Sequence, residues 1–215
     1  MQTFILSSIR SGISLLSGII NCLPNVKIAS LDFELCLDQM KIEDTSESIQ
    51  LINITPGCYF KYGLRILDGL YFLKKENARF IWLIRHPLIS MTSATITNQI
   101  NVELALSYWG NVNTCFWYLY HSLPKERMIR IKYEDILLNY TSLKEVFTFL
   151  GEKYNEQYVR YGDFDQPLIG NPIFDSGRIN LERIDHHPEK HLLRNWDKYS
   201  NTKLIKELGY KRSFD

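Results

Sequence analysis

The apolar segment at residues 79–85, which reads RFIWLIR, constrains the fold of this chain more than any other feature. Its apolar residues run without interruption, which is typical of a central strand of a parallel sheet, because helices cover both faces of such a strand. The segment ends at Arg85-His86-Pro87, and proline is favoured at the first position of a helix. We therefore expect a buried strand that leads directly into a helix.

Strand-like and helical patterns alternate along the rest of the chain. Strands are predicted over 4–8, 26–31, 49–55 and 127–132, and helices from 15 to Pro24 and over 63–76, 103–123, 142–150 and 202–208. Strands that alternate with helices indicate a parallel sheet. The expected fold class is α/β, with three layers and a central parallel β-sheet flanked by helices, in a single domain over residues 1–215.

Two stretches of the chain, 37–50 and 162–190, have no hydrophobic period and are expected to be loops or lids. The helix at 103–123 is rich in aromatic residues, Trp109 and Tyr118 among them. We expect these side chains to pack in the core rather than to form a stacking surface for a substrate.

The charge balance limits the partners of this protein. Lys and Arg number 25 and Asp and Glu number 24, which gives a formal net charge of +1. A nearly neutral chain is not suited to coating nucleic acid, so we expect no nucleic-acid partner, and any bound anion must be held by a local cluster of positive groups. No uninterrupted apolar run approaches the ~20 residues that cross a bilayer, so no membrane span is expected.

The four cysteines lack the paired spacing of a zinc site or of a disulfide scaffold. We therefore expect no metal site and interpret the cysteines as reduced thiols of a cytoplasmic protein.

The first segment with chemical content follows the predicted strand at 4–8 and reads RSGISL at residues 10–15. A glycine-containing turn that enters a helix presents backbone N–H groups and the positive end of the helix dipole, which together bind anions. Arg10 adds a fixed charge, and Ser11 and Ser14 add hydroxyl groups. The segment is not a Walker A motif, because it lacks the G-x-x-x-x-G-K-[ST] pattern.

The second segment follows the buried strand. Arg85 ends this strand, and Ser93 lies eight residues later, about two turns into the next helix. Ligands of a parallel α/β sheet bind at the carboxyl ends of its strands. If the helix folds back, Arg85 and Ser93 converge on one phosphate; the other interpretation is that Arg85 is a solvated strand end.

Together the two segments resemble the sulfotransferases that use 3′-phosphoadenosine 5′-phosphosulfate (PAPS). In that family a [KR]-S-G-T-[TS]-x-L segment binds the 5′-phosphosulfate, and residues 10–16 here read RSGISLL. The family binds the 3′-phosphate with an R-x-P motif and a serine eight residues after the arginine, here Arg85, Pro87 and Ser93.

Three later features agree with this resemblance. A strand that ends in Y-E-D, whose tyrosine reaches the nucleotide, corresponds to residues 133–135, and F-L-G corresponds to residues 149–151. Trp196 precedes a final helix and Gly209-Tyr210. The five features cover residues 4–210, and the resemblance implies the P-loop NTPase-like sulfotransferase fold.

The resemblance implies a transfer of the sulfuryl group to a hydroxyl or amine by in-line displacement, with PAPS as co-substrate and no metal. The acceptor is a small molecule, a carbohydrate or a peptide, and the oligomeric state is left open. The implied residues for binding the co-substrate are Arg10, Ser11, Gly12, Ile13, Ser14, Leu15, Arg85, Ser93, Tyr133, Arg178 and Lys190.

The implied catalytic residues are Arg10, which stabilises charge on the leaving oxygen, and a carboxylate base. One branch of the family has Glu where this chain has Ser30, so the nearest carboxylates, Glu34 and Asp32, are the candidates for the base.

Two other functions stay open. Ile13 stands where the family has Thr, and together with Ser30 and the short chain this leaves a non-catalytic nucleotide-binding member of the fold as an alternative. A P-loop enzyme of phosphoryl transfer is the other alternative, against which the missing Walker A lysine argues.

Overall fold

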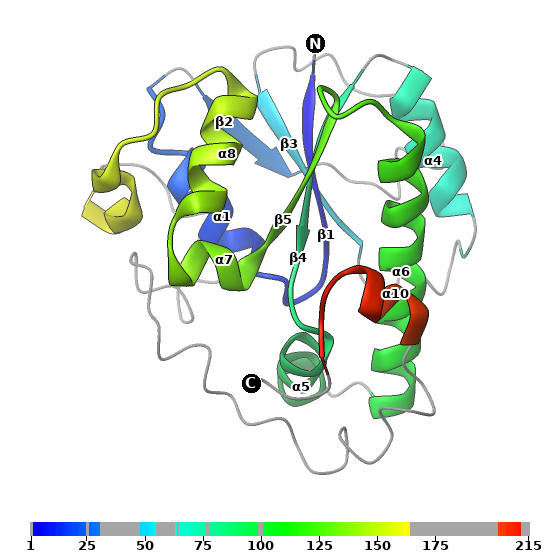
Figure 1. The fold of residues 1–215 in the computed structure, drawn as a ribbon. Helices are drawn as coiled ribbons and strands as arrows, with labels where there is room; N and C mark the ends of the chain where they lie inside the picture. Colours follow the sequence, from blue (N-terminus) through cyan, green and yellow to red (C-terminus); the bar gives the residue numbers. More distant parts are fainter. Residues whose placement is uncertain are drawn as a thin grey trace.

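A computed structural model of the chain describes residues 2–24, 26–30, 48–54, 63, 65–75, 78–98, 101–163 and 202–211. Five parallel strands form its central sheet in the order β2-β3-β1-β4-β5 (Figure 1). They are β1 (Thr3–Ser8), β2 (Lys27–Ser30), β3 (Ser48–Ile54), β4 (Arg79–Ile84) and β5 (Met128–Lys132). The predicted α/β class with a central parallel sheet is therefore confirmed.

The register of the sheet brings two loops together. In the pair of β1 and β4, Phe4 lies beside Phe80 and Ser7 lies beside Leu83. Because the two strands are parallel and in this register, the loops that follow them leave the sheet at the same edge. These loops carry the two segments that the sequence analysis singles out.

Alternate side chains of each strand pack on opposite faces of the sheet. Phe80, Trp82 and Ile84 of β4 belong to one apolar cluster, and Ile81 and Leu83 belong to another. All five side chains are fully buried. A strand covered on both faces explains the unbroken apolar run in the sequence.

Helices form the two outer layers (Figure 1). The first cluster includes residues of α4 (Arg65–Lys75), α5 (Pro87–Asn98), α6 (Val102–Ser122) and α10 (Thr202–Glu207). The second includes residues of α1 (Ile13–Ile20), α7 (Tyr133–Leu138), α8 (Thr141–Leu150) and the 3₁₀ segment η1 (Glu156–Asp163). Figure 1 shows α5 beyond the carboxyl ends of the strands, which places this helix against both loops.

Two local predictions differ from the structure, and one element was not predicted. Helix α1 ends at Ile20 with Asn21 as its C-cap, before Pro24 is reached. The Y-E-D residues do not end a strand: β5 stops at Lys132, and Tyr133 begins α7. Acidic residues in a first turn complement the helix dipole, so Glu134 and Asp135 favour this helix start. The segment η1 was not expected from the sequence.

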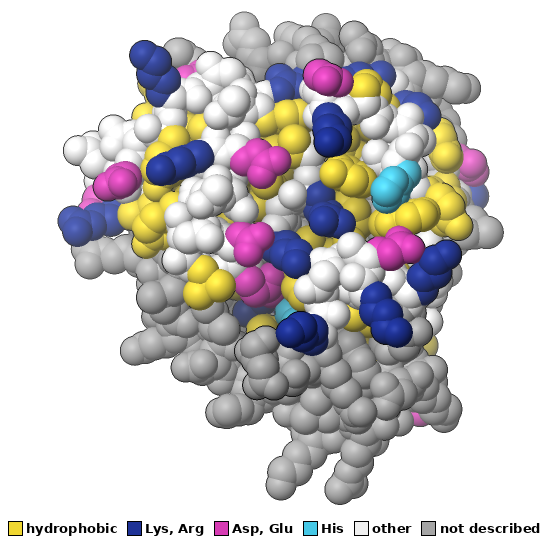
Figure 2. Space-filling view, in the orientation of Figure 1, with side chains coloured by type: hydrophobic (Ala, Val, Ile, Leu, Met, Phe, Trp, Pro, Cys, Tyr) yellow, Lys and Arg dark blue, Asp and Glu magenta, His cyan; other side chains and the backbone are white. Residues whose placement is uncertain are grey.

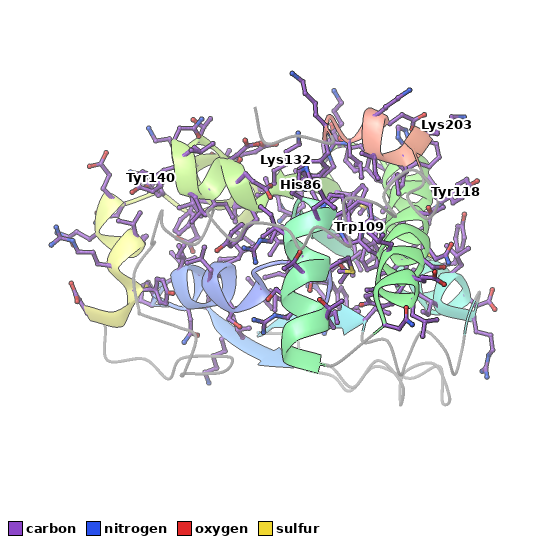
Figure 3. The ribbon with its side chains drawn as sticks, turned by 90° about the horizontal axis from the view of Figure 1, so that it is seen from below. His86, Trp109, Tyr118, Lys132, Tyr140 and Lys203 are labelled. Carbon is purple, nitrogen blue, oxygen red and sulfur yellow. The ribbon has the colours of Figure 1, made fainter. Side chains whose placement is uncertain are left out.

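The aromatic residues of α6 have two different environments. Trp109 is buried, as expected, and lies between α5 and α6 in Figure 3. Tyr118 is 52% exposed, so the prediction that it packs in the core is wrong. Aromatic residues occur on more than one side of α6, and only one side of a surface helix faces the core.

No helix in the described ranges combines the length and the apolar character needed to span a bilayer.

Candidate functional site

The loop after β1 has an unusual backbone conformation. Arg10 and Gly12 both have positive φ angles, 60° and 91°. Gly12 also lies against the ring of Tyr133, because a Cβ atom at Gly12 would meet Cδ2 of that ring at 2.2 Å. The left-handed conformation and the close approach of the ring both explain why glycine occupies this position.

Neighbouring elements hold this loop by its backbone. The Ser90 hydroxyl on α5 donates to the carbonyl of Ile9 at 3.0 Å. The Ile9 N–H donates to the Tyr108 hydroxyl at 3.1 Å, and that hydroxyl donates to the Ile54 carbonyl at the end of β3. Because α5, α6 and β3 each supply a contact, the loop is fixed before any ligand arrives.

The loop leads into α1 with backbone donors available. The first hydrogen bond of this helix runs from the Leu16 N–H to the Gly12 carbonyl at 3.2 Å. The N–H groups of Ile13, Ser14 and Leu15 precede this bond and have no partner within the helix. The Leu15 side chain is buried in the core, so only its backbone faces the loop. The Ser11 side chain is also fully buried, and its hydroxyl hydrogen bonds with that of Ser8 at 2.8 Å.

The second segment meets the first. The Arg10 Nε donates to the Ser93 hydroxyl on α5 at 2.8 Å, across 83 positions of sequence. The Arg85 Nη1 donates to the Arg10 carbonyl at 3.2 Å. The Arg85 guanidinium also lies over the Tyr133 ring, 4.3 Å from its centroid. The structure thus brings together Arg10, Arg85, Ser93, Gly12 and Tyr133, each of which the sequence analysis names.

The two guanidinium groups influence one another. Burial lowers the pKa of Arg10, the charge of Arg85 lowers it further, and Tyr133 partly offsets this. Two like charges that share a partly buried site oppose each other, and an anion placed between them lowers that cost. The donors around them are the hydroxyl of Ser93 and the N–H groups at the start of α1. This set is suited to phosphate or sulfate oxygens.

His86 has no exposed ring nitrogen for chemistry. Its Nδ1 accepts from the Leu88 N–H at 3.2 Å, so its Nε2 carries the proton that is donated to the Lys211 carbonyl at 2.8 Å. Burial lowers the pKa of His86 to about 4, with smaller contributions from Lys132 and Arg85. A neutral ring with both nitrogens engaged has a structural role here.

Four predicted site residues lie outside the described residues, namely Asp32, Glu34, Arg178 and Lys190. Conversely, sequence reasoning missed Ser90 and Tyr108, which hold the loop after β1. The spacing of Ser90 and Ser93, one helical turn apart, was an available signal for the first residue. No local pattern indicates Tyr108, whose contacts are long-range.

The site is built from charged groups and backbone geometry. A hollow of about 600 Å³ lies elsewhere, lined by Tyr140, Glu156, Gln157, Val159, Arg160 and Asp163, none of which is a predicted site residue.

On the face shown in Figure 2, acidic and basic side chains are interspersed rather than gathered by sign. Within the described ranges, no group of three or more His, Cys, Asp and Glu side chains is arranged to hold a metal ion.

Known structures share this fold. The sulfotransferase domain of the Synechococcus PCC 7002 olefin synthase is 18% identical, with a TM-score of 0.63 over 98% of this chain and 94% of that domain. Mouse sulfotransferase SULT7A1, solved in complex with PAP, is 15% identical, with a TM-score of 0.61 over 97% of this chain and 85% of the mouse chain.

The sulfotransferase domain from the curacin biosynthetic pathway is also 15% identical, with a TM-score of 0.58 over 98% of both chains. A comparison with protein-family models gives no match, and neither does one with curated proteins. The chain therefore has the sulfotransferase fold that its motifs predict, and this likeness concerns the fold.

Proposed function

We propose that this protein is a sulfotransferase of one domain, residues 1–215, that uses PAPS as its sulfuryl donor. The observation that carries the proposal is the contact between the two predicted segments: Arg10 donates to Ser93, and Arg85 donates to the Arg10 carbonyl. A fold shared with sulfotransferases, one of them solved with PAP (adenosine 3′,5′-bisphosphate), supports it.

The donor set suggests how the co-substrate is held. The N–H groups at the start of α1 and the Arg10 guanidinium are suited to the 5′-phosphosulfate, and Arg85 with Ser93 is suited to the 3′-phosphate. Tyr133 separates Gly12 from Arg85 and keeps both in place. From the resemblance alone, Arg178 and Lys190 are proposed to close over the nucleotide.

The proposed reaction is an in-line displacement. A new bond forms between the acceptor oxygen or nitrogen and sulfur as the bond from sulfur to the bridging oxygen breaks, and the acceptor proton passes to a base. Charge that develops on the bridging oxygen is stabilised by Arg10 and nearby N–H groups, in the manner of phosphoryl transfer. Glu34 and Asp32 are the proposed bases. The acceptor is proposed to be a small molecule, a carbohydrate or a peptide, and the compartment to be the cytoplasm.

Thermal unfolding with nucleotides tests the proposal directly. A ligand that binds only the folded chain raises the melting temperature by mass action. We expect adenosine 3′,5′-bisphosphate to raise it and 5′-AMP at the same concentration to raise it much less, because only the former has a 3′-phosphate for Arg85 and Ser93.

The control is ATP with magnesium. A shift with ATP but not with the 3′,5′-bisphosphate would replace the proposal with a phosphoryl-transfer function. Selective binding of the 3′,5′-bisphosphate without sulfuryl transfer from PAPS to any acceptor in a hydroxyl and amine screen would indicate a non-catalytic member of the fold.

A further inference from the structure

A carboxylate that the site does not use lies directly behind it. Glu134 follows Tyr133 in the first turn of α7 and is partly buried. Its Oε1 accepts from the backbone N–H of His86 at 2.7 Å, and its Oε2 accepts from the Tyr210 hydroxyl at 3.0 Å. Both carboxylate oxygens therefore have a defined partner, and the two partners come from segments far apart in the sequence.

The segment at 208–211 meets this region through the Glu134 carboxylate and through further contacts of His86 and Lys132. The His86 ring donates to the Lys211 carbonyl and lies edge-on to the Tyr210 ring, with 5.1 Å between centroids. The Lys132 ammonium lies 4.8 Å from the Tyr210 ring centroid and 3.5 Å from the Gly209 carbonyl. Figure 3, which looks onto the carboxyl ends of the strands, shows His86 and Lys132 close together near the start of α5.

Two residues of this cluster are direct sequence neighbours of candidate-site residues. His86 follows Arg85, and Glu134 follows Tyr133, whose ring supports the Arg85 guanidinium. An anchor on the His86 N–H fixes the peptide that leaves Arg85. A fixed backbone reduces the number of positions that the long arginine side chain samples, so less entropy is lost when an anion binds.

We propose that Glu134 is a positioning residue that joins the C-terminal segment to the peptide after Arg85 and so fixes Arg85 for the 3′-phosphate. This inference rests on the proposed function. The pKa shifts of Glu134 and Tyr210 agree with a hydrogen bond between the two side chains. Burial raises the pKa of Glu134 while its hydrogen bonds lower it, and burial together with the nearby Glu134 raises the pKa of Tyr210.

The test is selectivity for the 3′-phosphate, measured as the ratio of the dissociation constants of 5′-AMP and adenosine 3′,5′-bisphosphate by titration calorimetry on the full chain. Glu134→Ala is expected to lower this ratio about 10-fold, because it removes both hydrogen bonds of the carboxylate, those from the His86 N–H and from the Tyr210 hydroxyl. Glu134→Gln is expected to keep most of it, because an amide accepts from the His86 N–H and donates to the Tyr210 oxygen. Tyr210→Phe is expected to lower it about 3-fold, since it removes only one of these two bonds and leaves the one from the His86 N–H in place.

The control is Asn113→Ala, which removes a buried hydrogen bond to the Trp82 indole, 3.1 Å long, in another part of the core. This variant is expected to melt at a lower temperature with an unchanged ratio. An equal fall of the ratio in Asn113→Ala would mean that stability alone sets selectivity, which overturns the proposal. If Glu134→Ala does not fold, Tyr210→Phe decides, because it removes a single hydroxyl.

Failure of the positioning role can be distinguished from failure of the proposed function. A wild-type chain that prefers the 3′,5′-bisphosphate, together with an unchanged ratio in Glu134→Ala, keeps the proposed function and overturns the positioning role. A wild-type chain without that preference overturns both. Hydrogen exchange of the peptide at 202–211 gives a readout that needs no nucleotide: exchange as slow in Glu134→Ala as in wild type would contradict the joining role itself.

Discussion

The two loops at the candidate site acquire their shapes in different ways. The loop after β1 depends on its backbone, with left-handed residues at Arg10 and Gly12. The loop after β4 has ordinary backbone angles, since no described residue from 79 to 98 has a positive φ. Side chains fix that loop without any left-handed residue: the His86 ring accepts from the Leu88 N–H, and the Glu134 carboxylate accepts from the His86 N–H. The loop after β1 has side-chain supports as well, from Ser90 and Tyr108.

The difference indicates what each loop tolerates. A backbone held in a left-handed turn beneath an aromatic ring has no room for an added atom. A backbone held by side chains accepts small changes of volume but depends on the protonation and hydrogen bonding of those side chains. The following predictions test this difference with changes in or beside the two loops and with controls outside them.

Gly12→Ala is expected to have the largest effect on stability. The new methyl would overlap the Tyr133 ring, and the residue would keep an unfavourable left-handed angle. Strain and overpacking each cost about 1–3 kcal/mol, so the free energy of unfolding should fall by about 4 kcal/mol. Urea unfolding of the purified variant measures this loss.

Gly151→Ala is the matched control for that variant. Gly151 has a φ of 82°, close to that of Gly12, but nothing lies within 4 Å of an added Cβ atom. This substitution should cost only the left-handed strain, about 1–2 kcal/mol. Equal losses in the two variants would show that the Tyr133 contact does not constrain the first loop.

The two arginines should separate turnover from affinity. Arg10→Ala is expected to lower kcat about 100-fold or more with a smaller change in nucleotide affinity, because it removes charge stabilisation of the leaving oxygen. Steady-state kinetics with PAPS and an acceptor found in the screen measure this. An unchanged kcat would remove Arg10 from the reaction.

Arg85→Ala provides the comparison within the same site. It should weaken binding of adenosine 3′,5′-bisphosphate by about 1.5–3 kcal/mol and leave the affinity for 5′-AMP nearly unchanged. The same loss for both nucleotides would contradict the assignment of Arg85 to the 3′-phosphate.

The sequence was most informative where a local pattern reports burial. The unbroken run at 79–85 predicted β4 to within one residue, because a strand covered on both faces needs apolar residues at every position. The motif around Arg10 and the pair of Arg85 and Ser93 predicted residues that meet in space, since parallel strands deliver their loops to one edge.

Long-range contacts were beyond that reasoning. Tyr108 was assigned to no site, yet it ties the Ile9 N–H to the end of β3, which depends on how α6 crosses the sheet. The joining of Tyr210 to Glu134 likewise links positions 76 residues apart. Such contacts are set by tertiary packing, and a single sequence carries no local signal of them.

Acidification should weaken the second loop through His86. Its pKa in the folded chain is about 4, below the ordinary value of 6.5, so the unfolded chain binds a proton first as pH falls. The stability contributed by the neutral ring is therefore complete above pH 6.5 and is lost as the pH falls toward 4, by at most about 3 kcal/mol.

His86→Asn isolates the contribution of the His86 ring to the pH dependence. Asparagine does not titrate, and the backbone N–H at this position can still donate to the Glu134 carboxylate. Glu134 has a raised pKa, which acts in the opposite direction, and it is present in both proteins. Urea unfolding between pH 4 and 7 should give a shallower rise of stability with pH in the variant. Identical slopes would contradict a neutral buried His86.

Two serines on α5 give the smallest expected effects and the most direct separation of loop support from ligand binding. Ser90 is fully buried and donates to the Ile9 carbonyl, whereas Ser93 is half-buried and accepts from Arg10. Ser90→Ala should lower the free energy of unfolding by about 1 kcal/mol, the net contribution of one hydrogen bond. Ser93→Ala should leave stability nearly unchanged and weaken binding of adenosine 3′,5′-bisphosphate several-fold. The two positions lie one turn apart on one helix, so they have the same helix propensity and lose the same hydroxyl group. If both variants instead lose stability and keep their affinity for adenosine 3′,5′-bisphosphate, Ser93 only supports the loop after β1. Binding of the 3′-phosphate would then depend on Arg85 and not on Ser93.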